Sequence, residues 1–80
     1  MPPYYYALIR LGGNRAVAFY VGKGIDPSMD RVELLLNYPR LMAFTMWYGR
    51  FPEIISEYEL EEMIEHGTEV ITLYPEGPEW

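Results

Sequence analysis

Two apolar segments of similar length stand on either side of a short run of glycine and asparagine. Residues 4–11 are aromatic or aliphatic apart from Arg10, residues 16–22 are mostly apolar, and Gly12-Gly13-Asn14 lies between them. Glycine and asparagine tolerate the positive φ angles that tight turns between strands require. The pattern therefore predicts a β-hairpin, and the rest of the fold must build on this antiparallel strand pair.

The segment after the hairpin predicts helices. Asp26-Pro27 has the residue types that begin a helix, because aspartate accepts from unpaired N–H groups and proline suits the first turn. This helix is expected to run to about Tyr38, since Pro39 disfavours helix at the residue before it. Its apolar face is predicted to carry Met29, Val32, Leu35 and Leu36. Residues 40–49 are nearly all apolar, so periodicity does not separate a buried helix from a strand, and we favour a helix.

The clearest local signal is a predicted helix start at Ser56. Ser56 with Glu59 fits a capping box, and Ile55 with Leu60 fits a hydrophobic staple. Gly67 stands where glycine is favoured just after the last helical turn. A helix from Ser56 to about residue 66 is therefore expected.

The last apolar segment, residues 70–74, is rich in β-branched residues and carries apolar side chains on both faces, which suits a central strand.

The order of elements predicts an α+β domain. Its sheet would have three strands, antiparallel or mixed, made of the N-terminal hairpin and the C-terminal strand, with two or three helices packed on it. Residues 1–80 are expected to form a single domain with a loose acidic tail at 76–80.

Charge is distributed unevenly along the chain. All six lysine and arginine residues lie in residues 1–50 beside three acidic residues, whereas residues 51–80 carry nine glutamates and no cation, for a net charge of −6. An acidic surface repels phosphate, so direct binding to nucleic acid is not expected. The absence of cysteine excludes disulfides and thiolate metal sites, and no apolar run approaches the ~18 residues of a membrane span. Without a basic leader segment, the chain is expected to be cytoplasmic and not membrane-bound.

Two short segments of the predicted hairpin carry motifs. The second strand reads Phe19-Tyr20-Val21-Gly22-Lys23-Gly24, and the first contains Tyr6-Ala7-Leu8-Ile9. These segments resemble the paired signatures of the GIY-YIG endonuclease superfamily, whose first helix also carries an arginine soon after the glycine-lysine pair, as Arg31 does here. The resemblance covers a core of about residues 4–75 and implies a hairpin, helices and a third strand in that order.

The resemblance also implies a site. In the family, two tyrosines and the arginine surround the scissile phosphate, and a glutamate on the final helix holds a divalent ion, which suits the charge that phosphodiester cleavage develops. It therefore implies Tyr6, Tyr20 and Arg31 as catalytic residues, Lys23 beside them, and Mg²⁺ or Mn²⁺ as cofactor. The family's final helix follows the third strand, whereas only residues 75–80 follow the strand predicted at 70–74. The candidate metal-binding carboxylates are Glu59, Glu62 and Glu76.

Eight tyrosines and two tryptophans exceed what the core of an 80-residue domain can hide. Tyrosine, tryptophan and arginine are the residue types that supply interface hot spots. An exposed surface of aromatic rings and carboxylates is therefore expected to bind another protein. Its predicted binding residues are Glu57, Tyr58, Glu61, Glu65, Tyr48 and Trp80. Tyr4 and Tyr38 are further candidates for exposure.

These observations lead to a prediction and an alternative. The prediction is a non-catalytic protein-binding module on a degenerate GIY-YIG-like core, with no metal or other cofactor. In size and charge it is similar to phage-encoded inhibitors of host defence, anti-CRISPR proteins among them, which block basic nucleic-acid channels with carboxylates. The alternative is a minimal metal-dependent endonuclease, and a homodimer formed through the apolar residues 41–48 also stays open. The protein-binding module is preferred because the missing final helix and the acidic C-terminal segment outweigh three matched side chains.

Overall fold

The predicted hairpin is present. The computed structural model describes residues 4–22 and 25–74. β1 (Tyr5–Leu11) pairs antiparallel with β2 (Arg15–Gly22), and in the turn Gly13 and Asn14 adopt φ angles of +70° and +59°. Most side chains clash at such angles, which explains why glycine and asparagine occupy this turn.

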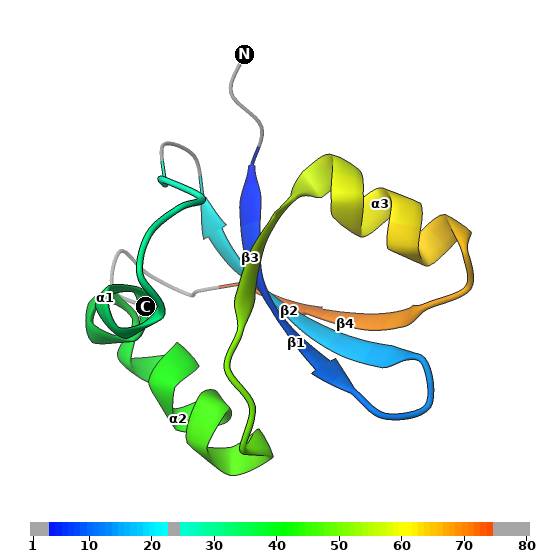
Figure 1. Cartoon of the computed structure of the whole chain (residues 1–80). Helices are drawn as coiled ribbons and strands as arrows, with labels where there is room; N and C mark the ends of the chain where they lie inside the picture. The colour runs from blue at the N-terminus through cyan, green and yellow to red at the C-terminus, as the bar shows by residue number, and fades with distance from the viewer. Residues whose placement is uncertain (1–3, 23–24, 75–80) are drawn as a thin grey trace.

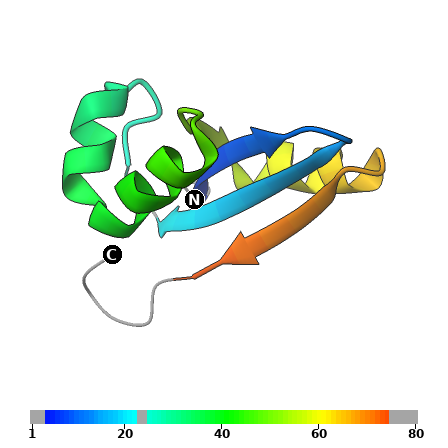
Figure 2. The ribbon, with the colours of Figure 1, turned by 90° about the horizontal axis from the view of Figure 1, so that it is seen from below.

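The sheet has four strands in the order β3-β1-β2-β4 (Figure 1). β3 (Glu53–Ser56) pairs antiparallel with β1, and β4 (Glu69–Leu73) pairs parallel with β2. The α+β class and the mixed sheet are confirmed, but the expectation of three strands missed β3. The central position expected for the last strand was also wrong, because β4 is an edge strand whose Ile71 is 59% exposed (Figure 2).

The first helix begins later than predicted. Asp26 closes a turn instead, since its carboxylate accepts the backbone N–H of Ser28 at 2.9 Å and the Ser28 hydroxyl at 2.7 Å. α1 (Arg31–Asn37) begins after Asp30, whose carboxylate accepts the N–H of Val32 at 3.2 Å. The residue type at the helix start was therefore predicted correctly, but the aspartate was the wrong one.

The side of α1 that packs on the sheet differs in part from the prediction. Leu34 and Leu35 are buried, whereas Val32 and Leu36, which were predicted to share the apolar face, are exposed. α2 (Pro39–Tyr48) follows directly, so the helix favoured for this apolar segment is confirmed.

α2 is apolar on both of its sides. Leu41 is fully buried, and the Phe44 ring lies 4.8 Å from the Phe19 ring on β2, measured between centroids. On the exposed side, Met46 and Trp47 are 77% and 82% exposed. A helix with apolar residues all round gives no amphipathic period, which is why the sequence pattern alone did not distinguish it from a strand.

α3 (Glu57–Glu65) begins as predicted. The Ser56 hydroxyl accepts the Glu59 N–H at 3.2 Å and the Glu59 carboxylate accepts the Ser56 N–H at 3.4 Å, which confirms the capping box. At the other end Gly67 has a φ angle of +92°. The Gly67 N–H donates to the Ile64 carbonyl and the Thr68 N–H donates to the Met63 carbonyl, each at 3.0 Å, as in a Schellman motif.

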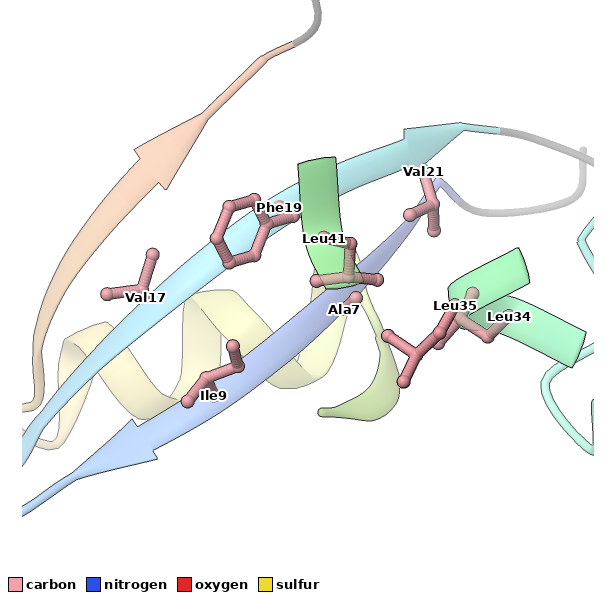
Figure 3. Close-up of a cluster of buried hydrophobic side chains, with 8 residues drawn as sticks. All are labelled: Ala7, Ile9, Val17, Phe19, Val21, Leu34, Leu35 and Leu41. Atoms are coloured by element: carbon pink, nitrogen blue, oxygen red, sulfur yellow. The ribbon is translucent and has the colours of Figure 1, made fainter. Parts of the chain in front are cut away.

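The sheet separates two apolar clusters. Odd-numbered side chains of β1 and β2 face α1 and α2, and this cluster is formed by Ala7, Ile9, Val17, Phe19, Val21, Leu34, Leu35 and Leu41 (Figure 3). Even-numbered side chains face α3, and this second cluster is formed by Leu8, Ala16, Ala18, Ile55 and Leu60. Figures 1 and 2 show α1 and α2 together on one side of the sheet and α3 on the other. Within the part of the chain that the structure describes, no helix is long and apolar enough to cross a membrane.

Candidate functional site

The acidic surface of the molecule is the exposed stripe of α3. Tyr58, Glu61, Glu62 and Glu65 stand at helical spacings of three and four residues, so they share one side of the helix. All four are exposed, Tyr58 by 63%. Residues 51–80 contain no lysine or arginine to neutralise these carboxylates. We call these four residues the acidic face of α3.

Glu57 does not belong to the acidic face. It is half-buried, its N–H donates to the Tyr4 carbonyl at 2.8 Å, and its carboxylate accepts the Tyr4 N–H at 3.2 Å. The expectation that Glu57 is exposed was therefore wrong. Because both backbone groups of Tyr4 are satisfied by Glu57, this residue attaches the start of α3 to the start of β1.

Two tyrosines expected at the surface pack on the opposite side of the sheet. Tyr48 is half-buried, with its ring stacked on Phe44 at 6.3 Å between centroids, and Tyr38 donates its hydroxyl hydrogen to the Val21 carbonyl at 3.2 Å. Burial raises the pKa of Tyr38. Both expectations of exposure were wrong because both tyrosines pack against the first cluster. Trp80 lies outside the described residues.

A groove of about 470 Å³ lies beside the acidic face, between β3 and α3. Ile55 and Met63, which pack in the second cluster, supply its apolar lining. Its polar lining residues are Arg10, Glu53, Glu59, Glu62, His66 and Thr68. The groove thus combines an apolar surface with three carboxylates, one guanidinium and one imidazole.

The charges of the groove are partly paired. Arg10 Nε lies 2.8 Å from Glu53 Oε1, and Glu59 is held in the capping box. The His66 ring nitrogen Nδ1 lies 2.7 Å from the Glu62 carbonyl oxygen. Among the described residues, no side chain pairs with the Glu62 carboxylate. Glu62 is therefore the groove carboxylate available to a cationic ligand.

Sequence reasoning missed Arg10, Glu53 and His66 as parts of this groove. A signal was present, because Glu53 precedes two isoleucines and the capping box, which is the pattern of a short strand leading directly into a helix. The approach of Arg10 depends on the pairing of β1 with β3, across 43 residues of sequence. That pairing carries no local signal.

The two motif tyrosines meet on the α3 side of the sheet. Tyr6 and Tyr20 are direct cross-strand partners with ring centroids 5.6 Å apart. Tyr4 and Tyr74 each lie 5.6 Å from the Tyr20 ring, so four tyrosines form one cluster. Tyr74 was not predicted to take part, and it does so because β4 continues the parallel register that places Leu73 beside Phe19.

The environment of Tyr6 favours its protonated form. Its pKa is raised above the usual tyrosine value, first by burial and then by a hydrogen bond with Tyr74 and by the nearby charges of Tyr74, Glu57 and Tyr20. A phenolate that activates water would need the opposite shift at neutral pH. Tyr6 is therefore suited to packing and hydrogen bonding rather than to general base catalysis.

The remaining motif residues do not join the tyrosine cluster in the described structure. Arg31 begins α1, lies 5.9 Å from the Phe51 ring centroid and lines a hollow with Leu34 and Ile54, which pack in the first cluster. Tyr6 packs against the second cluster, on the other face of the sheet. The structure thus brings Tyr6 and Tyr20 together but leaves Arg31 on the other face. Lys23 lies outside the described residues.

A helix does follow the third strand in chain order, because β3 precedes α3. The strand predicted at 70–74 corresponds to β4, so it is the fourth described strand in chain order rather than the third. Of the candidate metal-binding carboxylates, Glu59 caps α3, Glu62 lines the groove, and Glu76 lies outside the described residues. Within residues 4–22 and 25–74, no three histidine, aspartate or glutamate side chains converge as ligands.

No family model, curated protein or solved structure matches the chain. The GIY-YIG resemblance stays a prediction that rests on the two tyrosine motifs.

Proposed function

We propose that this chain is a non-catalytic protein-binding module that recognises a basic surface of another protein through the acidic face of α3. The observation that carries the proposal is the stripe of Tyr58, Glu61, Glu62 and Glu65 on one side of a well-capped helix. Residues 51–80 carry no lysine or arginine, and the Arg10 guanidinium of the adjoining groove is paired with Glu53, so the stripe presents a net negative field.

The chemistry of this face suits a basic partner. Tyr58 offers a rigid aromatic anchor of the type that dominates interface energies, and the surrounding carboxylates can pair with lysine and arginine. Protein surfaces that bind nucleic acid carry such clusters of lysine and arginine. The chain would therefore compete with phosphate for such a surface, as an inhibitor of a nucleic-acid-binding defence complex does. We place this interaction in the cytoplasm.

The test is a selection from a randomised 12-residue peptide library displayed on phage. The wild-type chain is expected to enrich peptides rich in lysine and arginine, with an affinity that falls as salt is raised. A triple variant, Glu61→Lys, Glu62→Lys and Glu65→Lys, is expected to lose this enrichment while its circular dichroism stays unchanged. Enriched peptides without an excess of basic residues would refute the proposal.

A metal-dependent endonuclease is the second candidate, favoured by the direct pairing of Tyr6 with Tyr20 and by the helix after β3. The position of Arg31 on the other face of the sheet weighs against it. Its test is nicking of supercoiled plasmid and cutting of single strands in Mg²⁺ and in Mn²⁺. Cleavage that Tyr20→Phe and Arg31→Ala both abolish would establish the nuclease and contradict the binding module.

A further inference from the structure

β3 has a backbone edge that faces away from the sheet. Among the described strands, only β1 pairs with it. The Glu57 N–H donates to the Tyr4 carbonyl, and bonded pairs alternate along antiparallel strands, so Tyr6 with Ile55 is the next bonded pair. The N–H and carbonyl of Ile54 therefore point outward, where another strand could pair with them.

A hollow flanks this edge on each face of the sheet. On the α3 side lies the groove of about 470 Å³, and on the α1 side lies a second hollow of about 240 Å³. The lining of the second hollow is mixed, because the charged side chains of Arg31 and Glu53 stand beside the apolar residues Pro27, Met29, Leu34, Pro52 and Ile54. In Figure 1, β3 runs between α3 on one side and α1 and α2 on the other.

We propose that an extended segment of the partner protein adds a strand to the open edge of β3 and places its side chains alternately in these two hollows. Side chains of a strand alternate between faces, and β-strand addition uses such flanking pockets for specificity. The partner residue opposite Ile54 points to the α1 side. Its two neighbours point to the groove and are lysine or arginine. The inference rests on the proposed function and specifies the partner as a segment with a basic residue on each side of the residue opposite Ile54.

The groove suits a long cationic side chain. The stem of a lysine or arginine can lie on Ile55 and Met63 while its charged end reaches the Glu62 carboxylate. Glu53 is already paired with Arg10, so Glu62 carries the recognition. Glu61 lies on the same helix one position away but outside the groove lining, which makes it a matched control.

The experiment uses the tightest-binding peptide from the phage selection, synthesised with one backbone amide methylated at a time. Addition of an antiparallel strand predicts an alternating pattern: methylation of the residue opposite Ile54 weakens binding about tenfold or more, and methylation of its neighbours changes binding less than about twofold. Glu62→Lys is expected to weaken binding at least about fivefold more than Glu61→Lys, although both change the net charge equally.

The outcomes separate the two proposals. A basic peptide whose binding shows no alternation on methylation, or responds equally to Glu61→Lys and Glu62→Lys, would overturn strand addition and leave recognition by the acidic face standing. A selection that yields no basic peptide would overturn both. Alternation together with the difference between the two variants would establish β3 as the docking edge.

Discussion

The junction between β3 and α3 depends on one side chain, and Ser56→Ala tests its contribution. Ser56 ends the edge strand and caps the helix that together form the groove. The variant removes the bond from the Glu59 N–H to the Ser56 hydroxyl at 3.2 Å and leaves that helical N–H without its partner.

The expected loss of stability is about 1 kcal/mol, the usual cost of replacing a serine cap by alanine. The unfolding free energy of an 80-residue domain is only ~4–12 kcal/mol, so the loss is readily measured. It corresponds to a fall in Tm of about 4–8 °C. The assay is urea denaturation followed by circular dichroism, in which the midpoint moves down with little change of slope.

Two matched variants make the result specific. Ser56→Asn is expected to keep most of the stability, because asparagine caps helices about as well as serine. Ser28→Ala removes an exposed hydroxyl that bonds Asp26 at 2.7 Å in a turn, and it should cost less than about 0.5 kcal/mol. The reasoning is refuted if Ser56→Ala costs no more than Ser28→Ala, or if Ser56→Asn loses as much as Ser56→Ala.

Three further predictions concern the two packed sides of the sheet. Leu41→Ala, at a fully buried position of α2, should lower the unfolding free energy by about 2–5 kcal/mol, and a loss below 1 kcal/mol in urea titration would contradict the assigned packing. Thr45→Val should raise the unfolding free energy by about 1 kcal/mol, because the buried Thr45 hydroxyl has no hydrogen-bond partner among the described residues. A lower urea midpoint for this variant would show that the hydroxyl does have a partner. Because Tyr6 keeps its proton to higher pH in the folded chain than in the unfolded chain, the free energy of unfolding should fall above about pH 10. In the Tyr6→Phe variant this fall should be less steep. If thermal unfolding from pH 8 to 11 shows the same dependence of stability on pH for both proteins, the described environment of Tyr6 is refuted.

Local sequence signals predicted those parts of the fold whose determinants are close in sequence. The Gly-Gly-Asn turn and the capping box of Ser56 involve contacts within a few residues, and both are present. The start of α1 was predicted too early because two aspartates in this segment could each cap a helix. The Asp26 carboxylate accepts the N–H of Ser28 and closes a turn, so Asp30 caps the helix instead.

Longer-range features were beyond local reasoning. β3 is only four residues long and is a strand because it pairs with β1, so the two isoleucines before the capping box are a short signal that is easily missed. The face on which Arg31 lies is set by the packing of α1 against the sheet through Leu34 and Leu35, and this packing depends on contacts with β1 and β2 that are distant in sequence. The acidic stripe of α3 was predictable from helical spacing, whereas the groove beside it required the approach of Arg10 across the sheet.

The central claim is that the α3 side of the molecule binds a basic segment of another protein. The most direct test is a titration of the ¹⁵N-labelled chain with the tightest-binding peptide, followed by amide chemical shifts. The account predicts that the largest shifts fall on residues 53–65, in β3 and α3, and that α2 around Trp47 is unaffected. Largest shifts at Trp47 and its neighbours on α2, with α3 unchanged, would contradict it.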